Sequence, residues 1–129
     1  MKHLIDIMEL TVEEIDRIIA TVDRSKAEGQ RNRAILETLY SCGLRVSELV
    51  NLKLSDLYFD EGFIKVEGKG NKQRLIPISP RAINEIKLYF TDRNQIEVKS
   101  GHEDFVFISL RRGKRLSRIM IFHMIKELA

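Results

Sequence analysis

The chain has 129 residues, 43% of them hydrophobic and 32% charged, so it is long enough to form one domain with a core of its own. It holds 22 Lys and Arg against 19 Asp and Glu, and a net charge of +3 does not by itself indicate a polyanionic partner. A single cysteine excludes an internal disulfide and favours a reducing compartment. There is no signal-peptide pattern and no apolar run long enough to cross a membrane, so we predict a cytoplasmic protein.

The first half of the chain predicts three helices. Thr11 and Glu14 form a capping-box pattern before an apolar stripe at helical spacing. The stripe consists of Val12, Ile15, Ile18, Ile19 and Val22. A second helix is predicted over about residues 32–42, and its apolar positions are Ile35, Leu36, Leu39 and Tyr40. Gly43 should end this helix, because glycine tolerates the left-handed conformation found there, and residues 46–52 should form a short third helix.

A small antiparallel sheet is predicted next. Apolar runs at residues 57–59, 63–67 and 74–78 are separated by turn residues. The second turn has Gly70 and Asn71 at its tip, and both residue types accept a positive φ. These runs predict two or three strands between helices.

Two further helices are predicted in the second half. Ser79 is expected to be an N-cap, with Pro80 as the first helical residue. Residues 105–108 are predicted to be a short buried strand or a core-filling segment, and a basic loop follows at 111–115. Ser117 is expected to cap the last helix. The whole pattern predicts a mostly helical α+β fold with a small antiparallel sheet.

Arg45 is the first candidate for a chemical role. Its planar guanidinium matches two phosphate oxygens and stays charged at any relevant pH. Apolar neighbours should hold it rigidly, and Glu48 lies three residues later, on the same face of the helix, where it is placed to orient it. Taken alone, such a pair is also typical of a structural ion pair at a helix start.

Lys69 is the second candidate, because it lies between Gly68 and Gly70. The glycines allow the backbone to approach a ligand closely, and Lys72 and Arg74 add positive charge nearby. The alternative is an exposed hairpin tip with solubilising cations.

Together these motifs resemble those of a known family. The run Cys42-Gly43-Leu44-Arg45-Val46-Ser47-Glu48-Leu49 is followed by Leu52-x-x-Ser55-Asp56 and by Gly68-Lys69-Gly70-Asn71-Lys72-x-Arg74-x-Ile76-Pro77. This pattern is similar to the catalytic domain of the tyrosine recombinases, also called phage-type integrases, and above all to their Xer-like members. The resemblance extends from about residue 10 to the end of the chain.

The resemblance implies cleavage and rejoining of double-stranded DNA through a covalent 3′-phosphotyrosine. It implies that Arg45 binds the non-bridging oxygens of the scissile phosphate and that Glu48 orients this arginine. Lys69 becomes the general acid for the departing 5′ oxygen and is preferred over Lys72. No metal or other cofactor is implied. The DNA-binding residues are predicted to be Lys72, Arg74, Arg111, Arg112, Lys114 and Arg115, and the full-length protein is expected to form a tetramer on DNA.

Part of the family's pattern is missing from this chain. The family continues with a His-x-x-Arg pair and a nucleophilic tyrosine, whereas His123 and Lys126 resemble that pair only superficially. Tyr40 and Tyr89 fit apolar stripes and are predicted to be core residues, and Tyr58 lies at a strand position. We therefore expect the chain to be the N-terminal part of a catalytic domain, excised or from a truncated gene, lacking the DNA-clamping domain and inactive alone.

Two other hypotheses remain open. In the first, residues 32–42, Gly43 and residues 45–52 form a non-catalytic helix-turn-helix module for DNA binding. The recombinase interpretation differs from it in requiring Lys69 near the phosphate that Arg45 holds. In the second, apolar surface left uncovered by absent helices leads the chain to form dimers.

Overall fold

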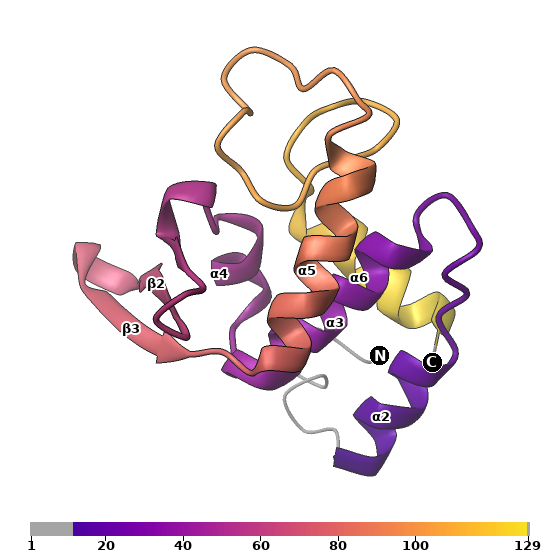
Figure 1. The fold of residues 1–129 in the computed structure, drawn as a ribbon, viewed down its shortest axis with the longest axis horizontal. Coiled ribbons are helices and arrows are strands. Elements are labelled where there is room, and N and C mark those ends of the chain that lie inside the picture. Colours follow the sequence, from indigo (N-terminus) through magenta and orange to yellow (C-terminus); the bar gives the residue numbers. More distant parts are fainter. Residues whose placement is uncertain (1–11, 129) are drawn as a thin grey trace.

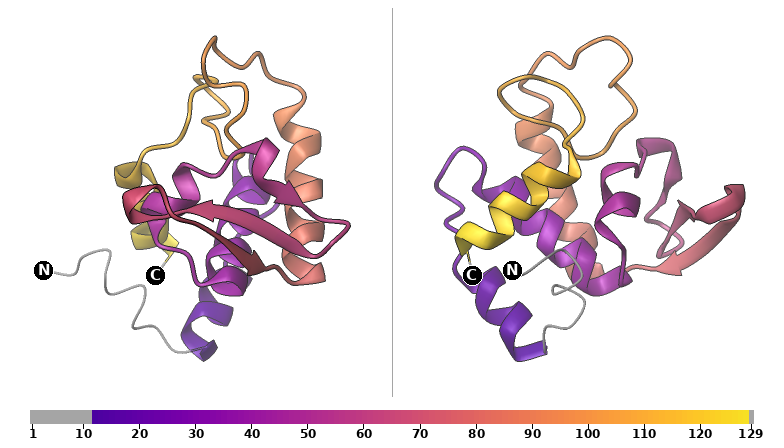
Figure 2. Two further views of the ribbon diagram at one scale, coloured as in Figure 1. Left: turned by 90° about the vertical axis from the view of Figure 1, so that its left-hand side faces the viewer. Right: turned by 180° about the vertical axis from the view of Figure 1, so that it is seen from behind.

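The computed structural model describes residues 12–128 and has the predicted α+β architecture (Figure 1). In chain order its elements are α2 (Val12–Ala20), α3 (Gly29–Cys42), α4 (Val46–Val50), η1 (Leu54–Asp56), β1 (Leu57–Tyr58), β2 (Phe63–Glu67), η2 (Lys69–Asn71), β3 (Gln73–Pro77), α5 (Pro80–Arg93) and α6 (Arg118–Leu128). Helices α3 and α5 form the centre of the body, and the β2–β3 hairpin projects from one side of it (Figures 1 and 2). Within residues 12–128, no helix is both long enough and apolar enough to cross a membrane.

The sheet has three antiparallel strands in the order β1-β2-β3, which confirms the predicted topology. In the register of β2 and β3, Val66 faces Arg74 and Ile64 faces Ile76. The turn between these strands has positive φ at Gly70 (74°) and at Asn71 (60°), as their residue types predict. This geometry places η2 at the tip of the hairpin.

Local capping signals set most helix boundaries. Gly43 ends α3 with φ 62° and ψ 35°, and its N–H donates to the carbonyl oxygen of Leu39. Ser79 caps α5 by accepting a hydrogen bond from the Ala82 N–H, and Ser117 caps α6 by accepting one from the Met120 N–H. Helix α3 begins at Gly29, three residues earlier than predicted. The predicted cap at Thr11 lies outside the described residues.

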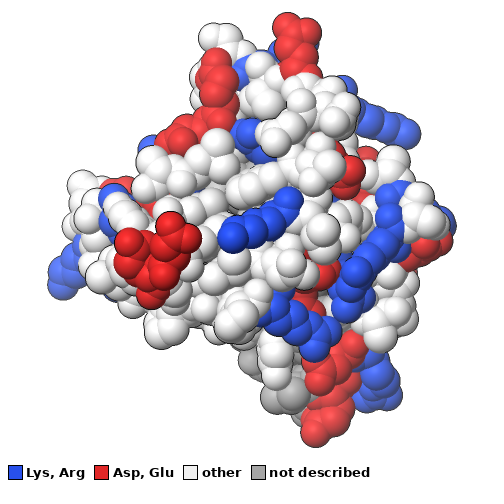
Figure 3. Space-filling view, in the orientation of Figure 1, with Lys and Arg blue, Asp and Glu red and all other residues white. Residues whose placement is uncertain are grey.

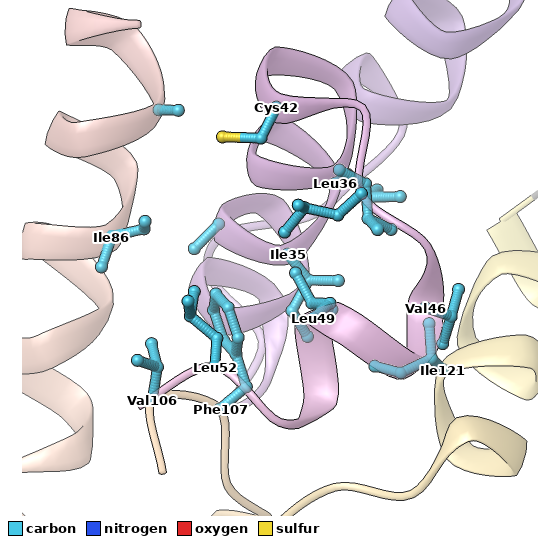
Figure 4. Packing of buried hydrophobic residues seen from close by; sticks show 14 of the residues in the cluster. Ile35, Leu36, Cys42, Val46, Leu49, Leu52, Ile86, Val106, Phe107 and Ile121 are labelled. Carbon is cyan, nitrogen blue, oxygen red and sulfur yellow. The ribbon is translucent and has the colours of Figure 1, made fainter. Parts of the chain in front are cut away.

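The core lies between α3, α4, α5 and α6 (Figure 4). Ile35 of α3, Leu49 of α4 and Ile86 of α5 are fully buried in it, and Ile121 of α6 lies beside Val46 of α4. Residues 105–108 fill the core and form only isolated bridges, so this segment is not a strand. The core therefore fixes α4, the helix that begins after Arg45.

Tyr89 joins α5 to the core-filling segment. Its side chain is fully buried; its hydroxyl donates to the carbonyl oxygen of Val106 at 2.8 Å and accepts from the N–H of Ile108 at 3.0 Å. Burial raises its pKa to about 12. The prediction of a core residue is confirmed for Tyr89 and wrong for Tyr40, whose exposed fraction is 41%. Leu36 and Leu39 on the same helix are buried, so the face of α3 that the core covers does not extend to Tyr40.

Two buried carboxylates join α3 to α5. Glu85 of α5 forms ion pairs with Arg33, at 3.1 Å, and with Arg24, at 3.4 Å, and its side chain is only 5% exposed. Glu37 of α3 pairs with Arg81 at 3.0 Å, and its side chain is 3% exposed. These ion pairs span up to 61 residues of sequence, and no local pattern indicated them.

Candidate functional site

Arg45 is the N-cap residue of α4, in an extended conformation with φ −74° and ψ 152°. Leu44 and Val46 on either side are buried, so the backbone is held by the core while the Arg45 side chain is exposed. Among the described residues, no hydrogen bond or ion pair is made by its guanidinium. The rigid setting predicted for Arg45 therefore applies to its backbone, and its guanidinium is open to a ligand.

Glu48 contacts both Arg45 and the hairpin. Its Oε1 accepts a hydrogen bond from the backbone N–H of Arg45 at 3.0 Å, and its Oε2 accepts from Nη1 of Arg74 at 2.9 Å. The Glu48 side chain is only 10% exposed, whereas that of Arg74 is 51% exposed. Glu48 thus fixes the main chain of Arg45, and its direct partner among the guanidinium groups is Arg74, a contact that the sequence did not indicate.

The ionised form of Glu48 is favoured in this position. Burial on its own raises the pKa of Glu48, but the hydrogen bonds from Arg74 and from the Arg45 backbone outweigh burial and lower the pKa below its ordinary value. A lowered folded-state pKa contributes stability that is present above the unfolded-state pKa and is lost as the pH falls through the folded-state pKa. The contact between α4 and the hairpin should therefore persist in mild acid.

We expect the carboxyl carbon of Glu48 to titrate at a lower pH than an ordinary glutamate when followed by ¹³C NMR. The backbone N–H shift of Arg45 should change with the same midpoint, because Glu48 accepts from it. The Arg74→Gln variant should move both midpoints upward, since it removes one of the groups that lower the pKa. Unchanged midpoints in that variant would contradict this account.

One cation of the hairpin, Arg74, lies beside the start of α4. Arg74 lies on β3 in contact with Glu48, three residues after Arg45, and Lys72 is exposed next to the hairpin tip. Lys69 begins η2 at the tip, but its side chain lies outside the described part of the structure. The hairpin that carries Lys69 and the helix that follows Arg45 are neighbours.

A groove of about 300 Å³ separates α4 from the hairpin. Its walls carry two basic residues, Lys53 and Lys65, and three acidic ones. The lining residues are Glu48, Asn51, Leu52, Lys53, Asp56, Lys65, Val66, Glu67 and Phe105. Lys65 is 3.7 Å from Asp56, so part of this charge is neutralised within the groove.

The second basic cluster reaches the other end of α4. The guanidinium of Arg115 donates to Oδ1 of Asn51, the residue after α4, and lies over the ring of Phe105 at 5.1 Å. Arg111, Arg112 and Lys114 are exposed in the same loop. Both predicted basic clusters thus touch α4 or the residue after it, and Arg115 has a structural partner that the sequence did not indicate.

The face that carries α5 is not a basic surface. Acidic and basic side chains alternate across it, with no continuous area of one sign (Figure 3). The basic clusters of the hairpin and of residues 111–115 contact α4 or the residue after it through Arg74 and Arg115.

The remaining candidate groups have other surroundings. Tyr58 stacks on Phe63 with ring centroids 4.9 Å apart, and Tyr89 is sealed in the core. The Nδ1 atom of His102 accepts the N–H of Arg115, and His123 is exposed. Cys42 is buried as predicted, and burial raises the pKa of its thiol to about 11. In the described part of the chain, no group of three or more His, Cys, Asp and Glu side chains could hold a metal ion.

The geometry of α4 also bears on the helix-turn-helix hypothesis. This helix has only five residues, and Val46, Leu49 and Val50 are buried. A recognition helix needs several exposed side chains that reach base edges. Helix α4 is too short and too buried for that role.

The sequence pattern of the phage integrase family matches residues 8–129. The chain belongs to the phage integrase family. It is 40% identical over 121 residues to tyrosine recombinase XerD of Halalkalibacterium halodurans and 38% identical over 123 residues to tyrosine recombinase XerC of Thermodesulfovibrio yellowstonii, covering 93% of this chain in each case. It spans about 40% of the length of these relatives.

Solved structures of integrase-family proteins share the fold. The XerA recombinase superimposes with a TM-score of 0.76 at 29% identity, over 92% of this chain and 41% of that one. The catalytic core of lambda integrase gives a TM-score of 0.66 at 20% identity, over 92% of this chain and 66% of that one, which is a likeness of fold alone. The expected membership of the tyrosine recombinases, and the fold of their catalytic domain, are therefore confirmed.

Proposed function

We propose that this chain forms the N-terminal part of the catalytic domain of a site-specific recombinase that cleaves and rejoins double-stranded DNA in the cytoplasm. The observation that carries this proposal is the position of Arg45. Its guanidinium is exposed at the start of α4, while Glu48 holds its backbone and pairs with the hairpin beside it. Family membership supplies the reaction class.

In the proposed reaction a tyrosine hydroxyl attacks the scissile phosphorus. A P–O bond to the tyrosine forms as the bond to the 5′ oxygen breaks, and Lys69 gives a proton to that leaving oxygen. Arg45 binds the non-bridging oxygens and stabilises the negative charge of the transition state, and its fixed backbone limits the positions that the guanidinium can take. Glu48 keeps the main chain at Arg45 fixed.

The attacking tyrosine and the His-x-x-Arg pair are not among these 129 residues, so we expect the chain alone to be inactive. The hydroxyl of Tyr89 donates a hydrogen bond inside the core. Tyr40 and Tyr58 lie upstream of the position at which the family has its nucleophile. DNA contacts are assigned to Lys72, Arg74, Arg111, Arg112, Lys114 and Arg115. Solved relatives include a lambda integrase tetramer bound to a Holliday junction, and we propose the same assembly for the full-length protein.

Self-association of the chain is also proposed. Ile119 and Met120 are 65% and 38% exposed at the start of α6, beside a hollow of about 440 Å³ that includes Val50 and Phe122. Exposed apolar surface of this kind favours association between copies. Sedimentation over a range of concentrations should show dimers, and a monomer throughout would refute this part.

The 129-residue chain should bind duplex DNA weakly and without forming a covalent adduct. Binding should fall steeply with salt, since it depends on phosphate contacts and the release of counterions. Fluorescence anisotropy at several salt concentrations measures the first property, and denaturing electrophoresis with a nicked suicide substrate measures the second. An adduct would refute the proposed inactivity, and salt-insensitive binding would refute the phosphate contacts.

A further inference from the structure

We propose that Arg74 is a positioning residue: through Glu48 it fixes the β2–β3 hairpin, and hence Lys69, against the start of α4. This inference rests on the function proposed above, because a fixed hairpin serves the reaction only if Lys69 acts on the phosphate that Arg45 binds. In this role Arg74 holds the hairpin in place, which is distinct from the phosphate contact expected from its charge.

The first argument is the double use of the Glu48 carboxylate. One oxygen accepts from the N–H of Arg45 and the other from the guanidinium of Arg74, so a single buried side chain connects the two segments. Charge-assisted hydrogen bonds of this kind are shorter and stronger than neutral ones. A shift of the hairpin away from α4 would break the contact at 2.9 Å and leave a carboxylate that is 10% exposed without its cationic partner.

The second argument is independent and comes from Gly68. Its φ of −102° is accessible to any residue, so the backbone does not require glycine here. A Cβ at this position would lie 3.2 Å from Nη1 of Arg74, closer than ordinary van der Waals contact. Glycine at position 68 leaves room for the same nitrogen that binds Glu48.

The third argument is the exposure of β3, the strand that carries Arg74. β3 is an edge strand of the sheet, and its residues are exposed or only partly buried. Leu75, next to Arg74, is 61% exposed. Ile64 and Val66 hold β2 against the core, but among the described side chains of residues 70–74 the pair of Arg74 with Glu48 is the only ion pair or hydrogen bond that reaches the body.

The test uses a nitroxide label on Lys72→Cys in a Cys42→Ala background of the whole chain. The label should broaden the NMR signals of the amides of residues 45–47. Arg74→Gln should cause a clear loss of this broadening, while Arg74→Lys, which keeps the charge, should restore part of it. Leu75→Gln on the same strand and Lys87→Gln on α5 are matched controls that should keep the broadening.

Glu48→Gln should cause the same loss, and combining it with Arg74→Gln should add little, because both substitutions break one contact. Broadening that persists in Arg74→Gln would overturn the proposal, as would full additivity of the two losses. An unchanged circular dichroism spectrum will show that the variants are folded. Failure of the proposed function would appear elsewhere, as normal adduct formation by an Arg45→Ala recombinase, and would leave this result standing.

Discussion

Arg45→Ala should abolish formation of the covalent protein–DNA adduct. The host for this test is a chimaera in which residues 8–129 replace the matching segment of the Halalkalibacterium halodurans relative, which supplies the rest of the protein. Removing one preorganised donor from a developing negative charge costs about 10²–10³-fold in rate. The expected loss is at least of that size, because a guanidinium can present two donors to one phosphate.

The measurement is the rate of adduct formation on a nicked DNA that carries the recombination site of that relative. The unsubstituted chimaera must form the adduct, and Lys87→Gln, which removes one exposed charge from α5, should leave the rate unchanged. Arg45→Lys should retain only part of the activity, since an ammonium group lacks the planar fork. Normal adduct formation by Arg45→Ala would remove Arg45 from the proposed site.

Glu85→Ala should lower the free energy of unfolding by about 3 kcal/mol, because removing one partner of a buried ion pair leaves the other charge uncompensated. The charge left behind is that of Arg33, whose side chain is only 16% exposed. Arg24 is about half exposed and should contribute little. Urea denaturation of the 129-residue chain at neutral pH measures the change.

Glu37→Gln is the matched comparison, since Glu37 is an equally buried carboxylate on the facing helix. Burial raises the pKa of Glu37, and the nearby Arg81 and Arg33 offset this only in part. A raised folded-state pKa means that the ionised form opposes folding as the pH rises above the unfolded-state pKa. The neutral variant should therefore be at least as stable as the parent at neutral pH. A loss as large as that of Glu85→Ala would contradict this distinction.

The sequence predicted best the features that depend on neighbouring residues. Gly43, Ser79 and the Gly70-Asn71 turn act within a few positions of the chain, and each has the predicted conformation. The family motif likewise singled out Arg45 and Lys69 as candidates, because its residue types are closely spaced along the chain. Local chemistry was sufficient in these cases.

Contacts between distant segments could not be predicted in the same way. Glu48 and Arg74 are separated by 26 residues, and Arg115 reaches Asn51 across 64. The prediction that Tyr40 is a core residue was wrong. Helical spacing indicates the direction of a side chain, but it does not show how far the packing of other elements extends along the helix. The burial of Glu85 depends on three polar residues of earlier segments, which no periodicity reveals.

The brevity of α4 has a consequence for how the site is lost. A helix of five residues cannot persist on its own in water, because nucleation costs more than so few hydrogen bonds return. Its conformation is sustained by Val46, Leu49 and Val50, which belong to the core. The arrangement at Arg45 and the hydrophobic interior should therefore melt as one cooperative unit, and amide hydrogen exchange at Leu49, whose N–H donates to the carbonyl oxygen of Arg45, should be as slow as in the middle of α3.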